Sequence, residues 1–395
     1  MPATAPQRAR LPAWLPALVL TTFTFATDDY VIAGVLPAIS ADLGVSQAAA
    51  GQLVTAFSLA FALTAPIASV TTATWPRRRL LTGALTLFVL ANWAAALTTS
   101  YALLLGLRVL AAIAAAAVVP TAYAIATTLA PEGRQGRYLA LVMGGLTGSL
   151  ALGVPIGTWM GGAFGWQATF WTGGALGLLA LAALRATLPE TPPVPAMPIR
   201  ERIAPLARPQ VLLGLLGIVA IVLGSMIVLT YLAPFLHDLA GAGPAELGWV
   251  FALAGLAGFA GGQLGGRAAD RWGADRALVT GVVGFTAVMA AFGACWLLRP
   301  VPLMALLPLL AVWAGVSWWI PPPAQTRLLA LAGPAGPQAL ALNSSAVYAG
   351  VSGGGAAGGL VLAGHGSGWL PAVAAGVELV ALVLFWLARR FNQTE

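Results

Sequence analysis

The stretch Ala26-Thr27-Asp28-Asp29-Tyr30 places two adjacent carboxylates inside an apolar segment that runs from Leu11 to Ile39. A segment of this length can cross a bilayer as a helix. One ionised side chain near the middle of a membrane helix costs about 2.5–3.5 kcal/mol on insertion scales. Two adjacent carboxylates therefore indicate either a functional role or a compensating polar or charged partner. The stretch therefore predicts a membrane helix with a functional carboxylate, and our first hypothesis is that one of the two binds a proton.

The composition of the whole chain agrees with a membrane setting. Of its 395 residues, 59% are hydrophobic and 8% are charged, whereas a soluble globular protein carries roughly 25% charged residues. The net charge of +7 would suggest a nucleic-acid partner in a soluble protein, but in a membrane protein the basic residues first report topology. The single cysteine, Cys295, excludes an internal disulfide and a cysteine-based metal site. We expect no metal, no cofactor and no nucleic-acid partner.

Twelve long apolar runs, rich in Ala and Leu, follow one another along the chain. Their length indicates helices, because a membrane β-barrel would need alternating segments of roughly ten residues. The pattern predicts an all-α membrane protein with twelve transmembrane helices. The runs cover residues 13–39, 49–73, 79–98, 101–129, 137–163, 167–188, 210–236, 246–266, 276–298, 301–329, 338–364 and 368–388.

The basic residues are all Arg, and seventeen of the nineteen fall on one side if both termini are cytoplasmic. The connections on the opposite side are short or nearly uncharged. Because cytoplasmic loops of membrane proteins are enriched in Lys and Arg, this distribution predicts that both termini face the cytoplasm. The seventeen are Arg8, Arg10, Arg77, Arg78, Arg79, Arg134, Arg137, Arg185, Arg200, Arg202, Arg208, Arg267, Arg271, Arg276, Arg327, Arg389 and Arg390.

One long connection, rich in proline and charge, divides the runs into six plus six. Its composition is typical of a semi-rigid linker. The second run of each half ends in a basic turn, Arg77-Arg78-Arg79 in the first half and Arg271 to Arg276 in the second. Two related bundles suggest a transporter whose site lies between them. We therefore predict a cytoplasmic tail over 1–12, an N-terminal six-helix bundle over 13–188, a cytoplasmic linker over 189–209, a C-terminal six-helix bundle over 210–388 and a cytoplasmic tail over 389–395.

The octapeptide Gly266-Arg267-Ala268-Ala269-Asp270-Arg271-Trp272-Gly273 resembles the cytoplasmic signature loop of the major facilitator superfamily. Its matching positions are Gly266, Asp270, Arg271 and Gly273. The first-half copy departs from the pattern, with Ala73 in place of the acid and Pro76 in place of the glycine. An Asp-based latch is therefore expected only in the second half.

The fifth run resembles the antiporter motif of exporters in this superfamily, and Arg108 on the fourth run matches the Arg of another family motif, although Ala111 and Ala112 follow it. Together with the turn at 165–170 and the Asn343-Ser344-Ser345 segment, Thr27 to Tyr30 looks most like the twelve-helix drug:proton antiporter family. The closest resemblance is to its chloramphenicol-resistance, arabinose-efflux-like and purine-efflux branch, over about residues 13–390. The motif positions in the fifth run are Gly144, Gly148, Gly153, Pro155 and Gly157.

The resemblance implies two pseudo-symmetric six-helix bundles that rock about a central site in the bacterial inner membrane. It implies proton-coupled efflux of small amphiphilic compounds such as drugs, by a monomer without enzyme activity. The alternatives are an exporter of a specific metabolite, such as a sugar or a purine nucleoside, and an importer or uniporter. An intramembrane aspartyl protease would need carboxylates on two facing elements, and Asp28 and Asp29 are neighbours on one helix.

Asp29 and Arg108 lie at comparable depth, about 14 and 10 Å from the outer ends of their runs at roughly 1.5 Å per residue. Burial favours a neutral carboxylic acid and a nearby guanidinium favours the carboxylate, so the balance can place proton binding in the physiological range. We assign the proton-coupling role to Asp29, with Asp28 and Arg108, because Asp29 matches the acidic position of the family pattern. The alternative is structural pairing, with one carboxylate on Arg108 and the other on backbone or water.

Several polar and aromatic residues are candidates for substrate contact: Tyr30, Tyr123, Tyr231, Trp318 and Asn343. Each has a structural alternative, either a hydrogen bond to a neighbouring helix or, for Trp318, a core or lipid-facing position. The glycines of the fifth run either pack against another helix or help to gate the seam between the bundles. Glu378 in the last run predicts a polar partner or a second proton site, and Pro321-Pro322-Pro323 predicts a break in the tenth helix.

Overall fold

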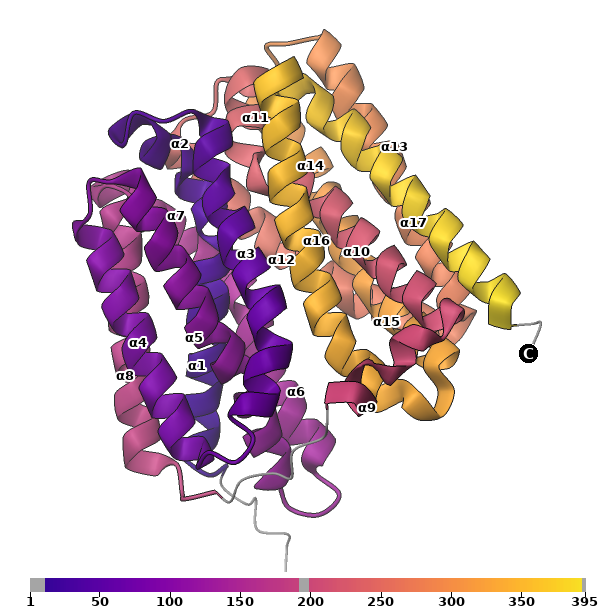
Figure 1. The fold of residues 1–395 in the computed structure, drawn as a ribbon. Coiled ribbons are helices and arrows are strands. Elements are labelled where there is room, and N and C mark those ends of the chain that lie inside the picture. The colour runs from indigo at the N-terminus through magenta and orange to yellow at the C-terminus, as the bar shows by residue number, and fades with distance from the viewer. Residues whose placement is uncertain (1–10, 192–198, 393–395) are drawn as a thin grey trace, which may run out of the picture.

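The structure is a computed structural model that describes residues 11–191 and 199–392. All regular elements in these ranges are helices, arranged in two bundles side by side (Figure 1). Residues 1–10 of the predicted N-terminal tail, with Arg8 and Arg10, residues 192–198 of the linker and the last three residues lie outside the described residues, while 389–392 of the predicted C-terminal tail continue α17. The first bundle is formed by α1 (Trp14–Tyr30), α2 (Ile32–Asp42), α3 (Gln47–Thr71), α4 (Arg77–Leu97), α5 (Tyr101–Thr128), α6 (Gln135–Gly148), η1 (Ser149–Gly153), α7 (Val154–Phe164) and α8 (Gln167–Thr187).

The second bundle follows the linker, which contributes two short elements, α9 (Ile199–Ile203) and η2 (Ala204–Ala207). Its long helices repeat the order of the first bundle. They are α10 (Pro209–Thr230), α11 (Leu232–Ala240), α12 (Pro244–Trp272), α13 (Ala274–Leu297), α14 (Leu303–Trp319), α15 (Pro321–Ala332), η3 (Gly333–Ala335), α16 (Gly336–His365), η4 (Ser367–Trp369) and α17 (Leu370–Asn392).

The predicted membrane helices are confirmed in number and place. Eleven helices in the described ranges are long and apolar enough to cross a bilayer, and α1 with α2 forms a twelfth span that bends by 46°. The bend follows Tyr30, directly after the two carboxylates. The first span of the second bundle is interrupted at the equivalent place, at Tyr231 between α10 and α11. The break predicted at Pro321-Pro322-Pro323 is also present, between α14 and α15.

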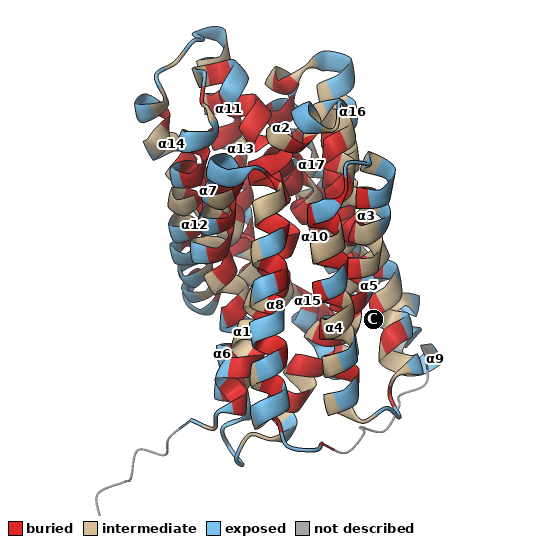
Figure 2. Ribbon diagram, turned by 90° about the vertical axis from the view of Figure 1, so that its left-hand side faces the viewer, coloured by how far each residue is buried: buried red, intermediate tan, exposed pale blue. Residues whose placement is uncertain are grey.

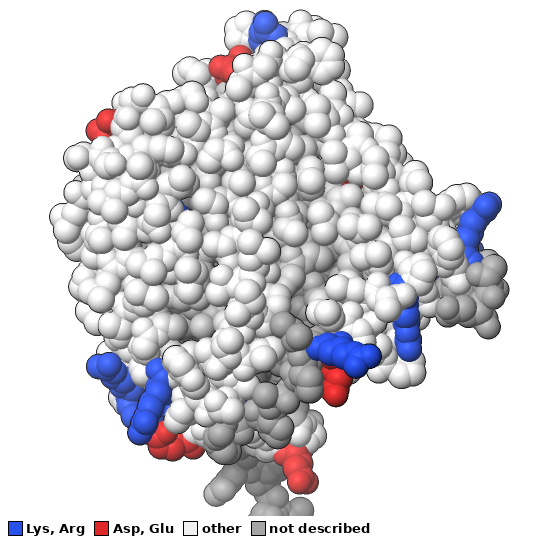
Figure 3. All heavy atoms as spheres, viewed as in Figure 1, with Lys and Arg blue, Asp and Glu red and all other residues white. Residues whose placement is uncertain are grey.

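The outer surface of both bundles is apolar, as a lipid-facing surface must be. Leu97, Trp249, Leu297 and Leu360 are each more than 70% exposed. Figure 2 shows exposed residues on the outward faces of the helices and buried residues on the inward faces. Figure 3 shows that the middle of one broad face is almost free of charged side chains, which lie around its edges.

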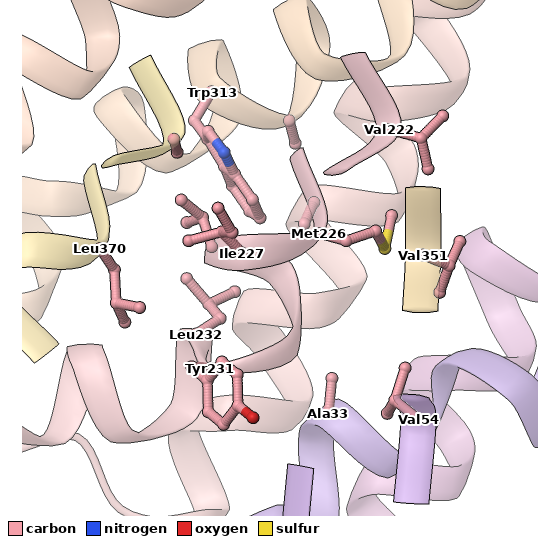
Figure 4. Packing of buried hydrophobic residues seen from close by; sticks show 14 of the residues in the cluster. Ala33, Val54, Val222, Met226, Ile227, Tyr231, Leu232, Trp313, Val351 and Leu370 are labelled. Atoms are coloured by element: carbon pink, nitrogen blue, oxygen red, sulfur yellow. The ribbon is translucent and has the colours of Figure 1, made fainter. Parts of the chain in front are cut away.

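The two bundles share a hydrophobic core at one end only. We call this the far end, where α2 and α11 lie, and the opposite end, near α9, the linker end (Figure 1). One buried cluster contains Ala33 and Val54 of the first bundle together with Val222, Met226 and Val351 of the second (Figure 4). The remaining buried cluster of the first bundle lies within that bundle, with Tyr348 packed against it from α16.

Contacts across the seam between the bundles repeat this asymmetry. The first half of α3 packs on the last half of α16, where a Cβ at Gly355 would lie 2.6 Å from the Thr55 hydroxyl. α7 packs on the first half of α12, where a Cβ at Gly248 would lie 3.6 Å from Trp159. α3 and α12 begin at the far end, and α7 and α16 end there. Close backbone packing of these segments therefore closes the seam at the far end.

Candidate functional site

A buried ion pair joins the first and fourth spans. Arg108 Nη1 lies 2.5 Å from Asp28 Oδ2, and Arg108 Nη2 donates to the Asp28 backbone carbonyl at 3.2 Å. Their side chains are 1% and 3% exposed. The guanidinium carbon lies 4.3 Å from the centre of the Phe57 ring. Asp28 and Arg108 therefore compensate each other's charge, while Arg108 Nε is buried without a hydrogen-bond partner among the described residues.

Asp29 is oriented differently, because successive helical residues point about 100° apart. Its side chain is 2% exposed and makes no ion pair within the described ranges. The hydroxyl of Tyr348, from α16 of the other bundle, lies beside its carboxylate, but neither carboxylate oxygen has a hydrogen-bond partner among the described residues. Arg108 therefore donates to Asp28 and not to Asp29, although both carboxylates are buried.

A cavity of about 320 Å³ lies between the bundles, a size that suits a small organic ligand. Tyr123 of α5 and Gln325, in the span Leu303–Ala335, line it in the linker-end halves of their spans, so the cavity extends from the closed seam toward the linker end. No Asp, Glu, Arg or His is among the described residues that line it. The polar and aromatic lining residues are Tyr30, Phe61, Tyr123, Ser225, Phe251, Trp313, Ser317, Trp318, Gln325, Asn343, Ser344 and Tyr348.

Four of the five candidate substrate residues lie in this wall: Tyr30, Tyr123, Trp318 and Asn343. Tyr231 does not. Its ring is fully buried at the far end, and its hydroxyl donates to the Gly355 carbonyl at 2.8 Å. Tyr231 therefore makes the hydrogen bond to a neighbouring helix, α16, that was its structural alternative.

Neither Asp28 nor Asp29 lines the cavity itself. Asp29 lies behind the wall, where Tyr348 separates it from the cavity space. The ring of Tyr348 stacks on Phe61 of α3, with centroids 3.7 Å apart, and this pair forms a contact between the bundles. Sequence reasoning missed Tyr348; the available signal was a tyrosine midway along an apolar run of the second half.

The glycines of the fifth span pack against the first span. A Cβ at Gly153 would lie 3.0 Å from the Thr27 Cβ, and one at Gly157 would lie 2.5 Å from Val31. Gly145 meets Thr22 in the same way, whereas no atom lies within 4 Å of a Cβ at Gly144. Of the motif positions, Gly153 and Gly157 thus permit close approach, Gly148 has only a loose contact with Phe23, and Gly144 faces open space.

A π-helical turn, η1, allows this glycine row to stay on one face. Positions 145 and 161 are sixteen residues apart, and in an uninterrupted α-helix they would point about 160° apart at 100° per residue. The turn at Ser149–Gly153 absorbs an extra residue just before Pro155, which lacks a backbone donor. Gly145, Gly153, Gly157 and Gly161 therefore all meet α1 or α2, near the two carboxylates.

The opposite face of the same span forms part of the seam with α12. A Cβ at Gly255 would meet the carbonyl oxygen of Leu150 and lie 2.8 Å from the Ala151 Cα. The fifth span is therefore packed between α1 and the second bundle.

The signature loop lies at the linker end, with Asp270, Arg271 and Gly273 exposed and Gly266 half-buried. Asp270 forms no ion pair within the described ranges. The acid that joins helix ends here is Asp275, which pairs with Arg327 at 3.1 Å and Arg389 at 3.5 Å. The sequence pattern did not distinguish these two acids.

Comparisons with known proteins agree with this architecture. The family model described as Major Facilitator Superfamily matches residues 18–336. The chain is 35% identical over 387 residues to the Chloramphenicol resistance protein of Streptomyces lividans, with 95% of each chain covered. It is 30% identical over 390 residues to the Inner membrane transport protein YdhP of Escherichia coli (strain K12), with 95% of this chain and 96% of the relative covered.

Among solved structures, the crystal structure of a D-xylose-proton symporter superimposes with a TM-score of 0.77 at 18% sequence identity, covering 95% of this chain and 97% of that chain. At this identity the likeness supports the fold alone.

Proposed function

The chain belongs to the major facilitator superfamily, and from this membership we propose that it exports small amphiphilic compounds such as drugs in exchange for protons. Its family and fold are those of membrane transporters rather than enzymes. We further propose that it works as a monomer by alternating access in the bacterial inner membrane, with both termini and the linker end in the cytoplasm. The gathering of Arg residues in the linker-end connections supports this orientation.

One observation carries the proton coupling: Asp29 is a buried carboxylate that Arg108 does not engage directly. A carboxylate in an apolar interior gains free energy by taking up a proton, because burial disfavours the charged form. Asp28 gains less free energy by taking up a proton, because the Arg108 guanidinium at 2.5 Å already compensates its charge. Asp29 is therefore the residue that we expect to alternate between its two protonation states.

The substrate class follows from the cavity wall. Aromatic rings supply apolar contact, and hydroxyl and amide groups supply hydrogen bonds without charge. A neutral amphiphile of modest size fits this lining better than an anion. The similarity to the Chloramphenicol resistance protein of Streptomyces lividans supports chloramphenicol as the first test compound.

Tyr348 supplies a route by which substrate binding and proton binding can influence each other. Its ring lines the cavity and its hydroxyl lies beside Asp29. A ligand that displaces the ring or binds the hydroxyl changes the surroundings of the carboxylate and therefore its affinity for a proton. Because coupling between two binding events is reciprocal, proton uptake at Asp29 then changes the affinity for substrate by the same factor.

The test is accumulation of labelled chloramphenicol in an efflux-deficient bacterial host that expresses wild type, Asp29→Asn or Glu132→Gln, with and without a protonophore. Glu132→Gln is the matched control, because it neutralises an exposed carboxylate in the α5–α6 connection. We expect wild type and Glu132→Gln to lower accumulation, and both Asp29→Asn and the protonophore to abolish the effect.

Export that survives both Asp29→Asn and the protonophore would exclude proton coupling through Asp29. No effect of wild type on chloramphenicol, at confirmed expression, would favour the alternatives. Parallel assays with sugars and purine nucleosides then separate a metabolite exporter from an importer, since an importer raises accumulation.

A further inference from the structure

Glu378, midway along α17, is a carboxyl that the proposed cycle does not use. Its side chain is 0% exposed. Ser225 Oγ donates to its Oε1 at 3.3 Å, while Oε2 is buried without a partner in the described ranges. A Cβ at Gly224 would lie 2.9 Å from the Glu378 Cγ, so the glycine on α10 makes room for this side chain.

Within residues 11–191 and 199–392, no cation forms an ion pair with Glu378. The helices and turns packed against α17 are α10, α13, α15, α16 and η4, and none of their titratable groups has a polar contact with Glu378 in the part of the chain that the structure describes. Arg389 on α17 itself is eleven residues away, about 16 Å along the helix. The other groups are Asp275, Arg276, Cys295, Arg327, Tyr348, His365 and Arg390.

Two of these cations have a partner elsewhere, because Arg327 and Arg389 both pair with Asp275. Burying an unpaired carboxylate in an apolar interior costs much more free energy than burying the neutral carboxylic acid. Burial without a cation therefore favours the protonated form of Glu378 in this state.

Ser225 connects this carboxyl to the cavity. It lines the cavity from α10 and donates to Glu378 on its other side. Glu378 is thus one side chain away from the cavity, as Asp29 is through Tyr348, but in the opposite bundle. The two buried carboxyls flank the same space from two helices that move with different bundles.

We propose that Glu378 is a second proton-binding site, in the second bundle, which exchanges its proton with water in the cavity at Ser225. In the exchange the carboxylic acid loses its proton to a water molecule, giving a hydronium ion and a carboxylate that accepts the Ser225 hydrogen bond. Ser225 is a positioning residue. Proton binding at Glu378 stands independently of the transported compound, whereas its contribution to coupling rests on the proposed function.

The experiment is infrared difference spectroscopy of the purified full chain as the pH is raised from mildly acidic to alkaline. We expect a carbonyl-stretch band of a buried carboxylic acid that disappears with rising pH in wild type and in Asp29→Asn, and is lost in Glu378→Gln. Gln keeps the size of the side chain and an oxygen that accepts from Ser225. Ser225→Ala should displace the band and move its loss to higher pH, because the carboxylate loses its donor.

A band that persists unchanged at alkaline pH, or that is equal in wild type and Glu378→Gln, would overturn the proposal. If Glu378→Gln does not fold, the Ser225→Ala displacement makes the assignment in its place, and an unmoved band then counts against Glu378. These spectra need no substrate, so failure of chloramphenicol export leaves them unaffected. In proteoliposomes that export chloramphenicol, Glu378→Gln should move fewer protons per chloramphenicol than wild type.

Discussion

The ring of Tyr348 in the second bundle stacks on the ring of Phe61 in the first, with centroids 3.7 Å apart and planes inclined by 21°. The same tyrosine carries the hydroxyl beside Asp29. A single side chain therefore touches the cavity, the opposite bundle and the buried carboxylate. Rearrangement of the seam and a change in the surroundings of Asp29 must accompany each other.

Tyr348→Phe separates these roles, because it keeps the stacked ring and removes the hydroxyl. We expect the ionised carboxylate of Asp29 to attract the neighbouring hydroxyl as a donor, and a hydrogen bond to a charged group contributes about 1.5–3 kcal/mol. The variant lacks this donor, so the midpoint of the pH dependence of chloramphenicol export should move to more alkaline pH while the protein remains folded. The measurement is export from cells held at a series of external pH values, and an unchanged profile would count against the contact.

Asp28→Asn and Asp29→Asn should differ in stability, although they alter neighbouring residues in the same way. Removing one partner of a buried ion pair costs about 3–5 kcal/mol, and Asp28 is the partner of Arg108. We expect Asp28→Asn to unfold at clearly lower temperature than wild type and Asp29→Asn to unfold near it. The half-buried Cys295 is the only thiol, so its reaction with a fluorogenic reagent on heating reports unfolding. Equal losses in both variants would contradict the assignment.

Trp318→Ala should weaken chloramphenicol binding by about tenfold, because a ring in the cavity wall supplies apolar contact and aromatic stacking. Trp249→Ala is the matched control, since that ring is 78% exposed on the outside of the same bundle. Equilibrium binding to purified protein compares the two. A similar loss in both variants would indicate a general effect on folding rather than a contact with the ligand.

Gly153→Ala should destabilise the first bundle by about 1–3 kcal/mol, the usual effect of overpacking. Its new Cβ would lie 3.0 Å from the Thr27 Cβ, whereas Gly144→Ala adds a methyl group where no atom lies within 4 Å. Thermal unfolding and export rate, measured on both variants, test the difference. Equal behaviour would mean that the glycine row does not set the distance between the first and fifth spans.

The sequence predicted the twelve spans and the break at Pro321-Pro322-Pro323, because length, apolarity and proline chemistry are local properties. It did not predict the bend after Tyr30 or the π-helical turn before Pro155. Both depend on how one helix packs against another. A glycine pattern read along a straight helix therefore included Gly144, while the structure uses Gly145.

The site was predicted in part for the same reason. Asp28, Asp29 and Arg108 could be grouped by depth, but which carboxylate pairs with Arg108 depends on the rotation of α1 about its axis. Tyr348 is 319 positions away from Asp29 along the chain, and no local pattern links them. Contacts between the bundles are therefore the part of the site that a single sequence predicts least well.

The shared core at the far end also has an energetic consequence for each turnover. Opening the cavity to that side requires the core to separate, which exposes apolar surface at about 25 cal/mol per Å². Small residues, among them Ala33, Val54 and Gly355, lie in this seam beside larger ones such as Met226 and Tyr231. One proton crossing a potential of 100 mV releases about 2.3 kcal/mol. Each small residue exposes less area than a larger one would, so it lowers the work that separation of the core requires.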